Sequence, residues 1–372
     1  MYELSLSASV TIDGECALAS PRSRGHGRAF DEKGYDGWAL PASEMRAVIT
    51  AYCSNCKSVE IRDLANPPEF PADVVWIDMV EPTREEELHV ETILGIEVPT
   101  RDDLRAIEPS ARLYVENNAV YMTASLIWKA ETEAPTLTDV AFILAGDKLV
   151  TIRYAHPKSF ALFIAALHRI PEQWRNGAAL LAKLLETIVD RTAEVLEMSV
   201  SRLDILSVHV FGDRAKKVRK PSNYLEEKLK DIAGHHRMIS KLRDSLGSLS
   251  RLLTFFYTIP VVQHDQETKE LCRTISRDIQ SLSEHASFVA GNITFLLDAS
   301  LGLINIEQNA IIKIFSIASV VFLPPTLVAS IYGMNFEYMP ELHLAAGYPY
   351  SLGLMVISAV IPFFFFRWKG WL

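Results

Sequence analysis

Apolar residues are concentrated near the C-terminal end of the chain, in two stretches without a charged residue. The first contains about 19 residues, from Ile314 to Tyr332, and the second about 20, from Gly347 to Phe366. A helix needs about 20 apolar residues to cross the hydrocarbon core of a bilayer. A buried helix of a soluble protein is normally interrupted by polar residues every turn or two. The pattern therefore predicts two membrane-spanning helices.

The charges that flank these stretches predict their orientation. Lys and Arg stand on the terminal sides only, at Lys313, Arg367 and Lys369. The connecting segment, residues 333–346, contains Glu337 and Glu341 but neither Lys nor Arg. Basic residues favour the cytoplasmic side of a membrane. We expect a multi-pass protein of the cell (inner) membrane, with both termini in the cytoplasm and the loop outside.

Upstream of the spans, strand and helix patterns alternate between about residues 74 and 157. Apolar and β-branched residues predict strands at residues 74–78, 119–123, 140–144 and 149–153, with a Gly146-Asp147 turn between the last two. Thr83 and Glu86 have the spacing of a capping box for a helix through Ile93. This part is expected to be a cytosolic α/β domain.

From Gly177 onward the apolar period is helical. A second helix is predicted over about Tyr224–Tyr257, ended by Pro260, and a third from near Asp265 to Tyr332. The third would have about 68 residues and a length of about 100 Å. Pro324-Pro325 predicts a kink in it. Its interior glycines, Gly291 and Gly302, predict close packing against a neighbouring helix.

The fold class expected is thus an α/β cytosolic domain followed by long helices and two C-terminal transmembrane helices. The predicted divisions are a disordered extension (1–44), the α/β domain (45–170), a helical hairpin and stalk (171–308), the first span (309–332), the external loop (333–346), the second span (347–366) and a basic tail (367–372).

Composition and the remaining motifs exclude several functions. The net charge of −9 argues against nucleic-acid binding. The polar N-terminus lacks an apolar signal core, so no cleaved signal is expected. Cys53 and Cys56 have the spacing of half a metal site, but no second pair follows, and two reduced thiols are the simpler interpretation. The soluble part has no nucleophile–base pair, metal-ligand cluster or phosphate-binding loop, so an enzyme is not expected.

Two helices per chain cannot enclose a pore, so a conducting assembly needs several copies in a ring. One face of the first span alternates bulky apolar residues with small or hydroxylic ones: Asn309, Ile312, Phe315, Ser319, Leu323, Thr326 and Ser330. Bulky rings on such a face gate by dewetting, and the polar groups offer oxygen atoms. The alternative, equally weighted for the hydroxyls alone, is that they hydrogen-bond between helices.

Neither span contains an acidic residue. Bare Mg²⁺ demands octahedral oxygen ligands and loses its water reluctantly. A pore of neutral oxygens therefore suits a hydrated ion. Gly333 would let the backbone turn its carbonyl inward, and the Asn335 amide would contact the coordinated waters. Glu337 and Glu341 would raise the cation concentration at this mouth.

The segment Tyr332–Leu342, YGMNFEYMPEL, resembles the signature loop of the CorA family of magnesium channels. The resemblance includes residues 304–309 and 320–329, and covers roughly residues 70–372. It implies a funnel-shaped homopentamer in the lipid bilayer that takes up Mg²⁺, with Co²⁺ or Ni²⁺ tolerated. It also implies no cofactor beyond the transported and regulatory Mg²⁺. Matching the family's motifs, the residues assigned to the selectivity loop are Tyr332, Gly333, Met334 and Asn335, with Asn309 a polar ring at the inner end of the pore and Thr326 a pore hydroxyl.

Family members sense cytosolic Mg²⁺ through acidic residues between protomers, and here the sequence departs. Arg105-Ala106 follows Leu104 where an acidic pair is usual, and Thr274 replaces an expected carboxylate. The remaining candidates for a regulatory site are Asp278 and Asp298, with Asp102, Asp103 and Glu108 near the altered pair. Two alternative functions stay open: a zinc-transporting relative of the same superfamily, and a membrane-tethered regulatory protein.

Overall fold

The N-terminal part of the molecule is built on a mixed β-sheet. The computed structural model describes residues 48–54, 58–61, 70–106, 108–132, 134–167, 169, 174–211, 224–335, 337–340, 344 and 346–371. The expected extension 1–44 and Cys56 lie outside these residues. The strands are β1 (Val48–Cys53), β2 (Ser58–Ile61), β3 (Val74–Val80), β4 (Leu113–Glu116), β5 (Ala119–Trp128), β6 (Thr136–Ala145) and β7 (Lys148–Arg153).

The strand order is β2-β1-β3-β7-β6-β5-β4, and β3 and β7 form a parallel pair between antiparallel ones. The four strands predicted from the sequence are confirmed. So is the Gly146-Asp147 turn, whose Gly146 has φ +59°. Helix α1 (Arg84–Leu94) begins at the predicted capping box, with both reciprocal hydrogen bonds between Thr83 and Glu86.

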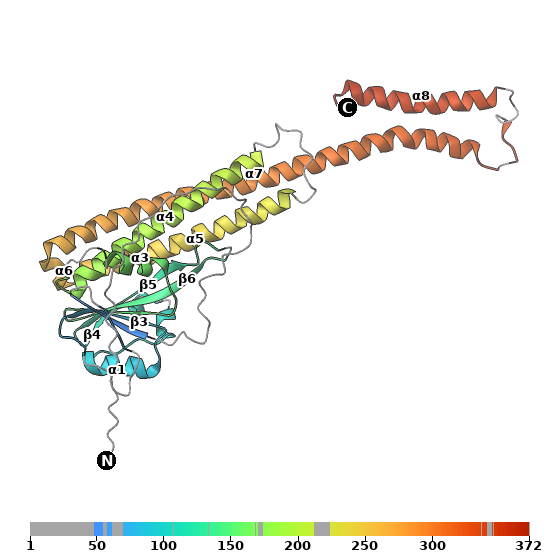
Figure 1. Cartoon of the computed structure of the whole chain (residues 1–372). Coiled ribbons are helices and arrows are strands. Elements are labelled where there is room, and N and C mark those ends of the chain that lie inside the picture. The colour runs from blue at the N-terminus through green and yellow to red at the C-terminus, as the bar shows by residue number, and fades with distance from the viewer. Residues whose placement is uncertain are drawn as a thin grey trace, which may run out of the picture. The chain divides into compact units, whose positions relative to one another are not determined.

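Helices cover both faces of the sheet (Figure 1). On one face, Val90 of α1 joins buried residues such as Ile77 and Met79 in one core. On the other face, Trp76 and Phe142 lie in a larger core, which includes buried residues of α3 (Lys158–Leu167), α4 (Gly177–Phe211) and α5 (Tyr224–Tyr257). Because β3 is buried on both faces, its sequence is apolar at every position but Asp78 rather than alternating.

A buried ion pair connects the two parallel strands. Asp78 of β3 and Arg153 of β7 are both almost inaccessible, and Nη2 of the arginine lies 2.7 Å from Oδ2 of the aspartate. The Thr151 hydroxyl donates to Asp78 Oδ1 and accepts from Trp76 Nε1, so the carboxylate sits in a hydrogen-bonded network. The network fixes the register in which Asp78 lies beside Thr151.

The C-terminal half is helical. It contains α4, α5, the short α6 (Pro260–His264), α7 (Gln266–Tyr332) and α8 (Gly347–Trp368). The predicted second and third helices are confirmed, although Pro260 also begins α6. With 67 residues, α7 stays helical through Pro324 and Pro325. It curves in its last third, where α8 runs beside it (Figure 1).

One side of α7 is packed by its own chain along a seven-residue repeat, which we call the packed seam. Its buried and half-buried members are spaced alternately by three and four residues: Cys272, Ile275, Ile279, Leu282, Ala286, Val289, Ile293, Leu296, Ser300 and Leu303. They face α4 and α5, which contact α7. The same repeat resumes against α8 with Ile317, Val321, Pro324 and Val328. A strict repeat of 3.5 residues per turn is the geometry of a left-handed supercoil.

Removing one partner of the buried pair should destabilise the domain strongly. We expect Asp78→Ala to lower the free energy of unfolding by about 3–5 kcal/mol, because it leaves the Arg153 charge buried without a counter-ion. Thermal or urea unfolding of the detergent-solubilised protein measures this change in the free energy of unfolding. Asp73→Ala, at an exposed position just before β3, is the control and should change the value by less than about 0.5 kcal/mol. Equal effects of the two would contradict this role.

Candidate functional site

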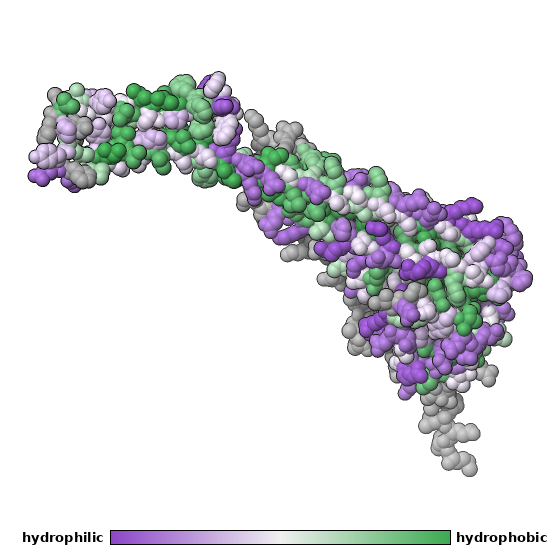
Figure 2. Space-filling view, turned by 180° about the vertical axis from the view of Figure 1, so that it is seen from behind, coloured by the Kyte–Doolittle hydropathy of each residue, from purple (hydrophilic) through white to green (hydrophobic). Residues whose placement is uncertain are grey.

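The C-terminal helix pair is almost entirely uncovered in the single chain. The end of α7 and the whole of α8 are long and apolar enough to cross a membrane, and only 6% of the most apolar window of each is buried. Figure 2 shows hydrophobic residues gathered over this pair, whereas hydrophilic residues cover much of the rest of the molecule. Core helices of a soluble protein would be buried, so that interpretation does not fit.

A second repeat runs along the far side of α7, and we call it the free seam. Its members are every seventh residue from Phe288 and every seventh from Gly291: Phe288, Gly291, Phe295, Asp298, Gly302, Asn305, Asn309, Ile312, Ser316, Ser319, Leu323, Thr326, Ser330 and Gly333. All are exposed except the half-buried Gly302. At 3.5 residues per turn this seam lies roughly 150° round the helix from the packed seam. It therefore points away from α4, α5 and α8.

The predicted pore face coincides with the membrane part of the free seam at six of its seven positions. The exception is Phe315, which is 69% exposed and lies one residue before the seam residue Ser316. The sequence prediction stepped by three residues from Ile312 to Phe315, whereas the seven-residue repeat takes a step of four, to Ser316. The seven-residue repeat along the whole of α7 includes Ser316. On this side the surface forms an open groove lined by Ser319, Phe322, Leu323, Thr326, Leu327 and Ser330.

The hydroxyl groups of the groove are bonded within their own helix. Ser319 Oγ donates to the Phe315 carbonyl at 2.9 Å, and Thr326 Oγ1 donates to the Phe322 carbonyl at 2.7 Å. Their protons are therefore engaged, and their oxygen lone pairs remain to accept hydrogen bonds. In the described structure these two hydroxyls do not bond across to α8. Groups of this kind suit a ligand that donates hydrogen bonds.

The two prolines add free acceptors close by. Pro324 and Pro325 have no N–H, so the carbonyls of Val320 and Val321 lose the donor that a regular helix supplies four residues on. Membrane helices tolerate such carbonyls where water or neighbouring groups satisfy them.

Helix α7 ends at the predicted selectivity loop. The Gly333 N–H donates to the Ala329 carbonyl at 3.0 Å. The φ of Gly333 is −87°, so the backbone freedom expected of a glycine is not used here. Space is the constraint instead, because a Cβ at this position would lie 3.1 Å from the Ala329 oxygen. Met334, Asn335 and Glu337 are exposed, and Glu341 lies outside the described residues.

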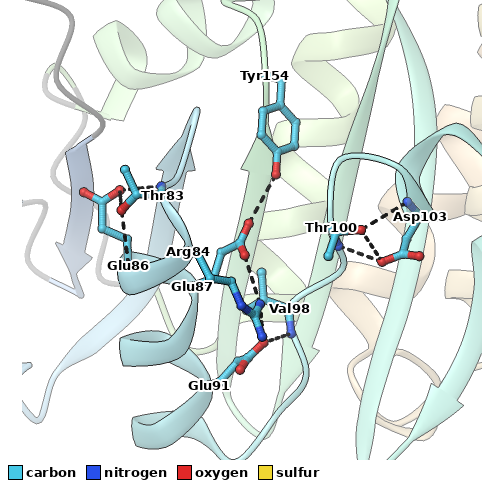
Figure 3. Close-up of polar contacts among 9 residues, drawn as sticks. All are labelled: Thr83, Arg84, Glu86, Glu87, Glu91, Val98, Thr100, Asp103 and Tyr154. Carbon is cyan, nitrogen blue, oxygen red and sulfur yellow. Dashed lines mark hydrogen bonds and ion pairs between the residues drawn. The ribbon is translucent and has the colours of Figure 1, made fainter.

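The altered sensor segment forms the short 3₁₀-helix η1 (Asp103–Arg105). Arg105 pairs with the highly exposed Asp102 at 3.5 Å, so the arginine offsets an acid of its own segment. Asp103 is occupied as a cap, since its Oδ2 accepts from the Thr100 N–H and hydroxyl (Figure 3). Neither carboxylate is left without a partner.

Nearby carboxylates of α1 are also engaged. Glu87 accepts from Arg84 at 3.0 Å and from the Tyr154 hydroxyl at 3.3 Å (Figure 3). Glu91 accepts from Arg84 and from the Val98 N–H. Burial and the adjacent Glu87 raise the pKa of Tyr154 to about 12, which keeps this hydroxyl a hydrogen-bond donor. The acids on this face serve local structure.

Arg112 ties η1 to the sheet and, through it, to α5. Its Nε donates to the Ala106 carbonyl at 2.6 Å, its Nη2 to the Leu104 carbonyl and to Asp139 Oδ1 at 2.7 Å. Its Nη1 donates to Ser125 Oγ, and the Ser125 backbone bonds both Ser245 and Ser248 of α5. One polar chain therefore connects η1 with α5, and α5 packs on α7.

Asp278 and Asp298, the candidate regulatory residues, are both exposed on α7. Asp278 lies close enough to Asp190 of α4 to repel it: burial first, then Glu186 and Asp278, raise the pKa of Asp190 above its usual value. Asp298 is on the free seam. No group of three or more His, Cys, Asp or Glu able to hold a metal occurs among the residues that the structure describes. The pairing of Asp190 with Asp278 needs tertiary structure and leaves no signal in the sequence.

The other sequence candidates have simple outcomes. Cys53 is a buried residue of β1. Apart from the adjoining residues and backbone of α7 itself, no atom of the described residues lies within 4 Å of where a Cβ on Gly291 or Gly302 would stand. The close packing expected at these two glycines is therefore not provided by a helix of this chain.

The chain matches known proteins in both sequence and fold. The sequence model of the CorA-like Mg²⁺ transporter protein family matches residues 71–368. The chain belongs to this family. The magnesium transport protein CorA of Salmonella typhimurium is 36% identical over 301 residues, which are 81% of this chain and 92% of that protein. The CorA magnesium transporter structure from Methanocaldococcus jannaschii matches with a TM-score of 0.66 at 22% identity, covering 88% of this chain and 98% of that one.

The structure of a ZntB cytoplasmic domain is a more distant match. The ZntB cytoplasmic domain of Vibrio parahaemolyticus has a TM-score of 0.52 at 13% identity, and the match covers 70% of this chain and 99% of that domain. It shares the fold alone. Membership of the CorA-like family makes the two exposed apolar helices membrane spans, with the sheet domain on the cytoplasmic side.

Arg112→Ala should loosen the sensor segment. We expect the free energy of unfolding to fall by about 2 kcal/mol or more, because four acceptors of a largely buried guanidinium lose their donor. Backbone amides of residues 100–106 should exchange hydrogen faster, as mass spectrometry would detect. Arg105→Ala, whose ion pair is exposed, is the matched control and should change stability by less than about 0.5 kcal/mol. Unchanged exchange in Arg112→Ala would refute the link.

Proposed function

We propose that this protein is a Mg²⁺ uptake channel of the cell (inner) membrane, assembled as a homopentamer. The observation that carries the proposal is the free seam: along its membrane part, neutral oxygens and bulky apolar groups alternate on the one side of α7 that its own chain leaves uncovered. Copies arranged with this seam inward would line a pore, and α8 would face the lipid. Membership of the CorA-like Mg²⁺ transporter family supports Mg²⁺ as the transported ion.

The groove suits a hydrated cation. Waters coordinated to Mg²⁺ donate hydrogen bonds outward, so a pore for the hydrated ion needs acceptors. Ser319 and Thr326 present oxygens whose protons are already donated to their own helix. At the mouth, Asn335 would bond the hydration shell, and the acid Glu337 would concentrate cations before they enter.

Transport of this kind needs no chemical step. A divalent ion crossing inward gains about 4.6 kcal/mol per 100 mV of membrane potential, which is twice the value for one charge. We therefore assign no enzymatic activity and no cofactor beyond the transported and regulatory Mg²⁺. Co²⁺ and Ni²⁺ have similar octahedral hydration and would be tolerated.

Asn335→Ala should abolish most Mg²⁺ flux. The amide is the polar side chain at the end of the pore helix, and a methyl group offers the hydrated ion no hydrogen bond. We expect the initial rate of Mg²⁺ entry into proteoliposomes to fall by about tenfold or more, as for the loss of about 1.4 kcal/mol. Asn292→Ala, an exposed asparagine of α7 off the free seam, is the matched control. Retained flux in Asn335→Ala would overturn the proposed selectivity loop.

The same assay separates magnesium from zinc transport. If Zn²⁺ enters at the faster rate and Mg²⁺ does not compete, the zinc-transporting alternative is correct. If neither ion enters while the protein is folded in the membrane, the two helices only tether it.

Regulation by cytosolic divalent ions is proposed at Asp278. Asp190 and Asp278 repel one another across α4 and α7, and a bound cation would relieve that repulsion. Further ligands, Asp298 among the candidates, would come from a neighbouring copy. A bound ion would favour the arrangement of helices in which Asp190 and Asp278 lie close together. Its release would favour an arrangement in which they move apart.

We expect Asp278→Asn to weaken the inhibition of current by millimolar cytosolic Mg²⁺, shifting half-inhibition to about threefold higher concentration or more, since one carboxylate charge is lost. Inside-out patches give the titration directly. Asp244→Asn, at an exposed position of α5, controls for a general change in charge. An unchanged titration in Asp278→Asn would place the sensor elsewhere or show that it is absent.

A further inference from the structure

The free seam of α7 continues well beyond the membrane, and its cytosolic part contains two large apolar side chains. Phe288 and Phe295 are 65% and 69% exposed in the single chain. They are seven residues apart, so they lie on the same line as Asn309, Leu323 and Ser330. At 1.5 Å per residue, the two rings are about 10 Å apart along the helix.

Neither the chain nor the bilayer covers these rings. The opposite side of α7 holds all the contacts with α4 and α5 in this region, through residues such as Val289 and Leu296. Lys313, at the cytoplasmic end of the first span, follows Phe295 by 18 residues, or about 27 Å of helix. Lipid tails do not reach that far. The remaining occupant of this line is the same line on other copies of the chain.

The neighbours on the free seam fit rings that point toward a shared axis. A helical side chain leans toward the N-terminus, and Gly291, four residues before Phe295, has no side chain to obstruct the Phe295 ring. The Phe288 ring lies back against His285, with ring centroids 6.5 Å apart. A Cβ on Gly291 would meet only open space, so the glycine leaves room on this side of the helix.

Acidic residues stand on both sides of the pair. Glu284 precedes Phe288 by one turn, and Asp298 follows Phe295 by one turn, both exposed on the same seam. A cation would be attracted to either position, whereas the two rings between them offer it no oxygen. Apolar constrictions of this kind oppose ion passage because water leaves them.

Resting on the proposed function, we propose that Phe288 and Phe295 of the assembled copies form an apolar collar on the ion path, on the cytosolic side of the membrane pore. The collar is a second barrier in series with the bulky residues Ile312 and Leu323 of the span. It holds the path dry where the seams converge, and it opens when the helices move apart.

The collar is tested by removing the rings in the full-length protein. We expect Phe288→Ala/Phe295→Ala to raise the initial Mg²⁺ influx into proteoliposomes about threefold or more, because water and ion then enter the constriction. Phe295→Asn should act in the same direction, and Phe295→Leu, which keeps an apolar side chain, should stay near wild type. Leu297→Ala is the control, since Leu297 is an exposed apolar residue of the same region but lies off the free seam.

Two further measurements make the result decisive. Under mild oxidant, Phe295→Cys should give disulfide-linked dimers that Leu297→Cys does not give, because only the seam faces its copies. The elution volume of each variant in detergent must match that of the wild type. Monomeric Phe variants would show an assembly contact and overturn the collar, and so would wild-type flux in the double variant.

Failure of the collar is distinguishable from failure of the channel. If wild type conducts, Asn335→Ala does not and the Phe variants behave as wild type, the collar alone is refuted. If wild-type protein conducts no Mg²⁺, the proposed function falls and the collar falls with it.

Discussion

The architecture of this protein depends on how one helix divides its surface. An α-helix offers a limited circumference, and α7 commits a continuous strip of it to α4, α5 and then α8. Because that strip keeps a strict seven-residue spacing, the side left over is also a continuous strip with the same spacing. Residues far apart in sequence, such as Phe295 and Thr326, are therefore constrained to one line. The arrangement of the sheet domain matters to the pore only through this helix.

The cytosolic domain supplies rigidity more than chemistry. Its parallel strand pair is fixed by Asp78 and Arg153 in the core, and its charged surface near η1 is occupied by local caps and ion pairs. Arg112 joins that surface to α5 through Ser125. A connected set of hydrogen bonds therefore runs from η1 to α5. Where Arg105 offsets Asp102, less negative charge remains to attract an ion, whereas Asp190 and Asp278 still repel one another.

Much of this was predictable from the sequence, for physical reasons. Membrane spans, the Thr83 capping box and the long helix are local patterns of hydropathy and hydrogen bonding, and all three are confirmed. Strand order was not predictable, since pairing between β3 and β7 involves residues more than seventy positions apart. The sequence prediction stepped from Ile312 to Phe315, whereas the seven-residue spacing of the folded helix passes through Ser316. Contacts between α4 and α7 required the fold itself.

An unbroken α7 of 67 residues also limits how such an assembly could open. Because one continuous helix runs from the cytosolic part to the membrane part, a rotation of α7 at Cys272 or Ile279 would be passed along the helix toward Leu323. Widening one level of the passage then changes the superhelical pitch at every level. Copies wound around one axis cannot unwind independently without clashing, so opening would be concerted. In a channel built this way the conductance would not rise one subunit at a time. All copies would change their twist together when the channel opens.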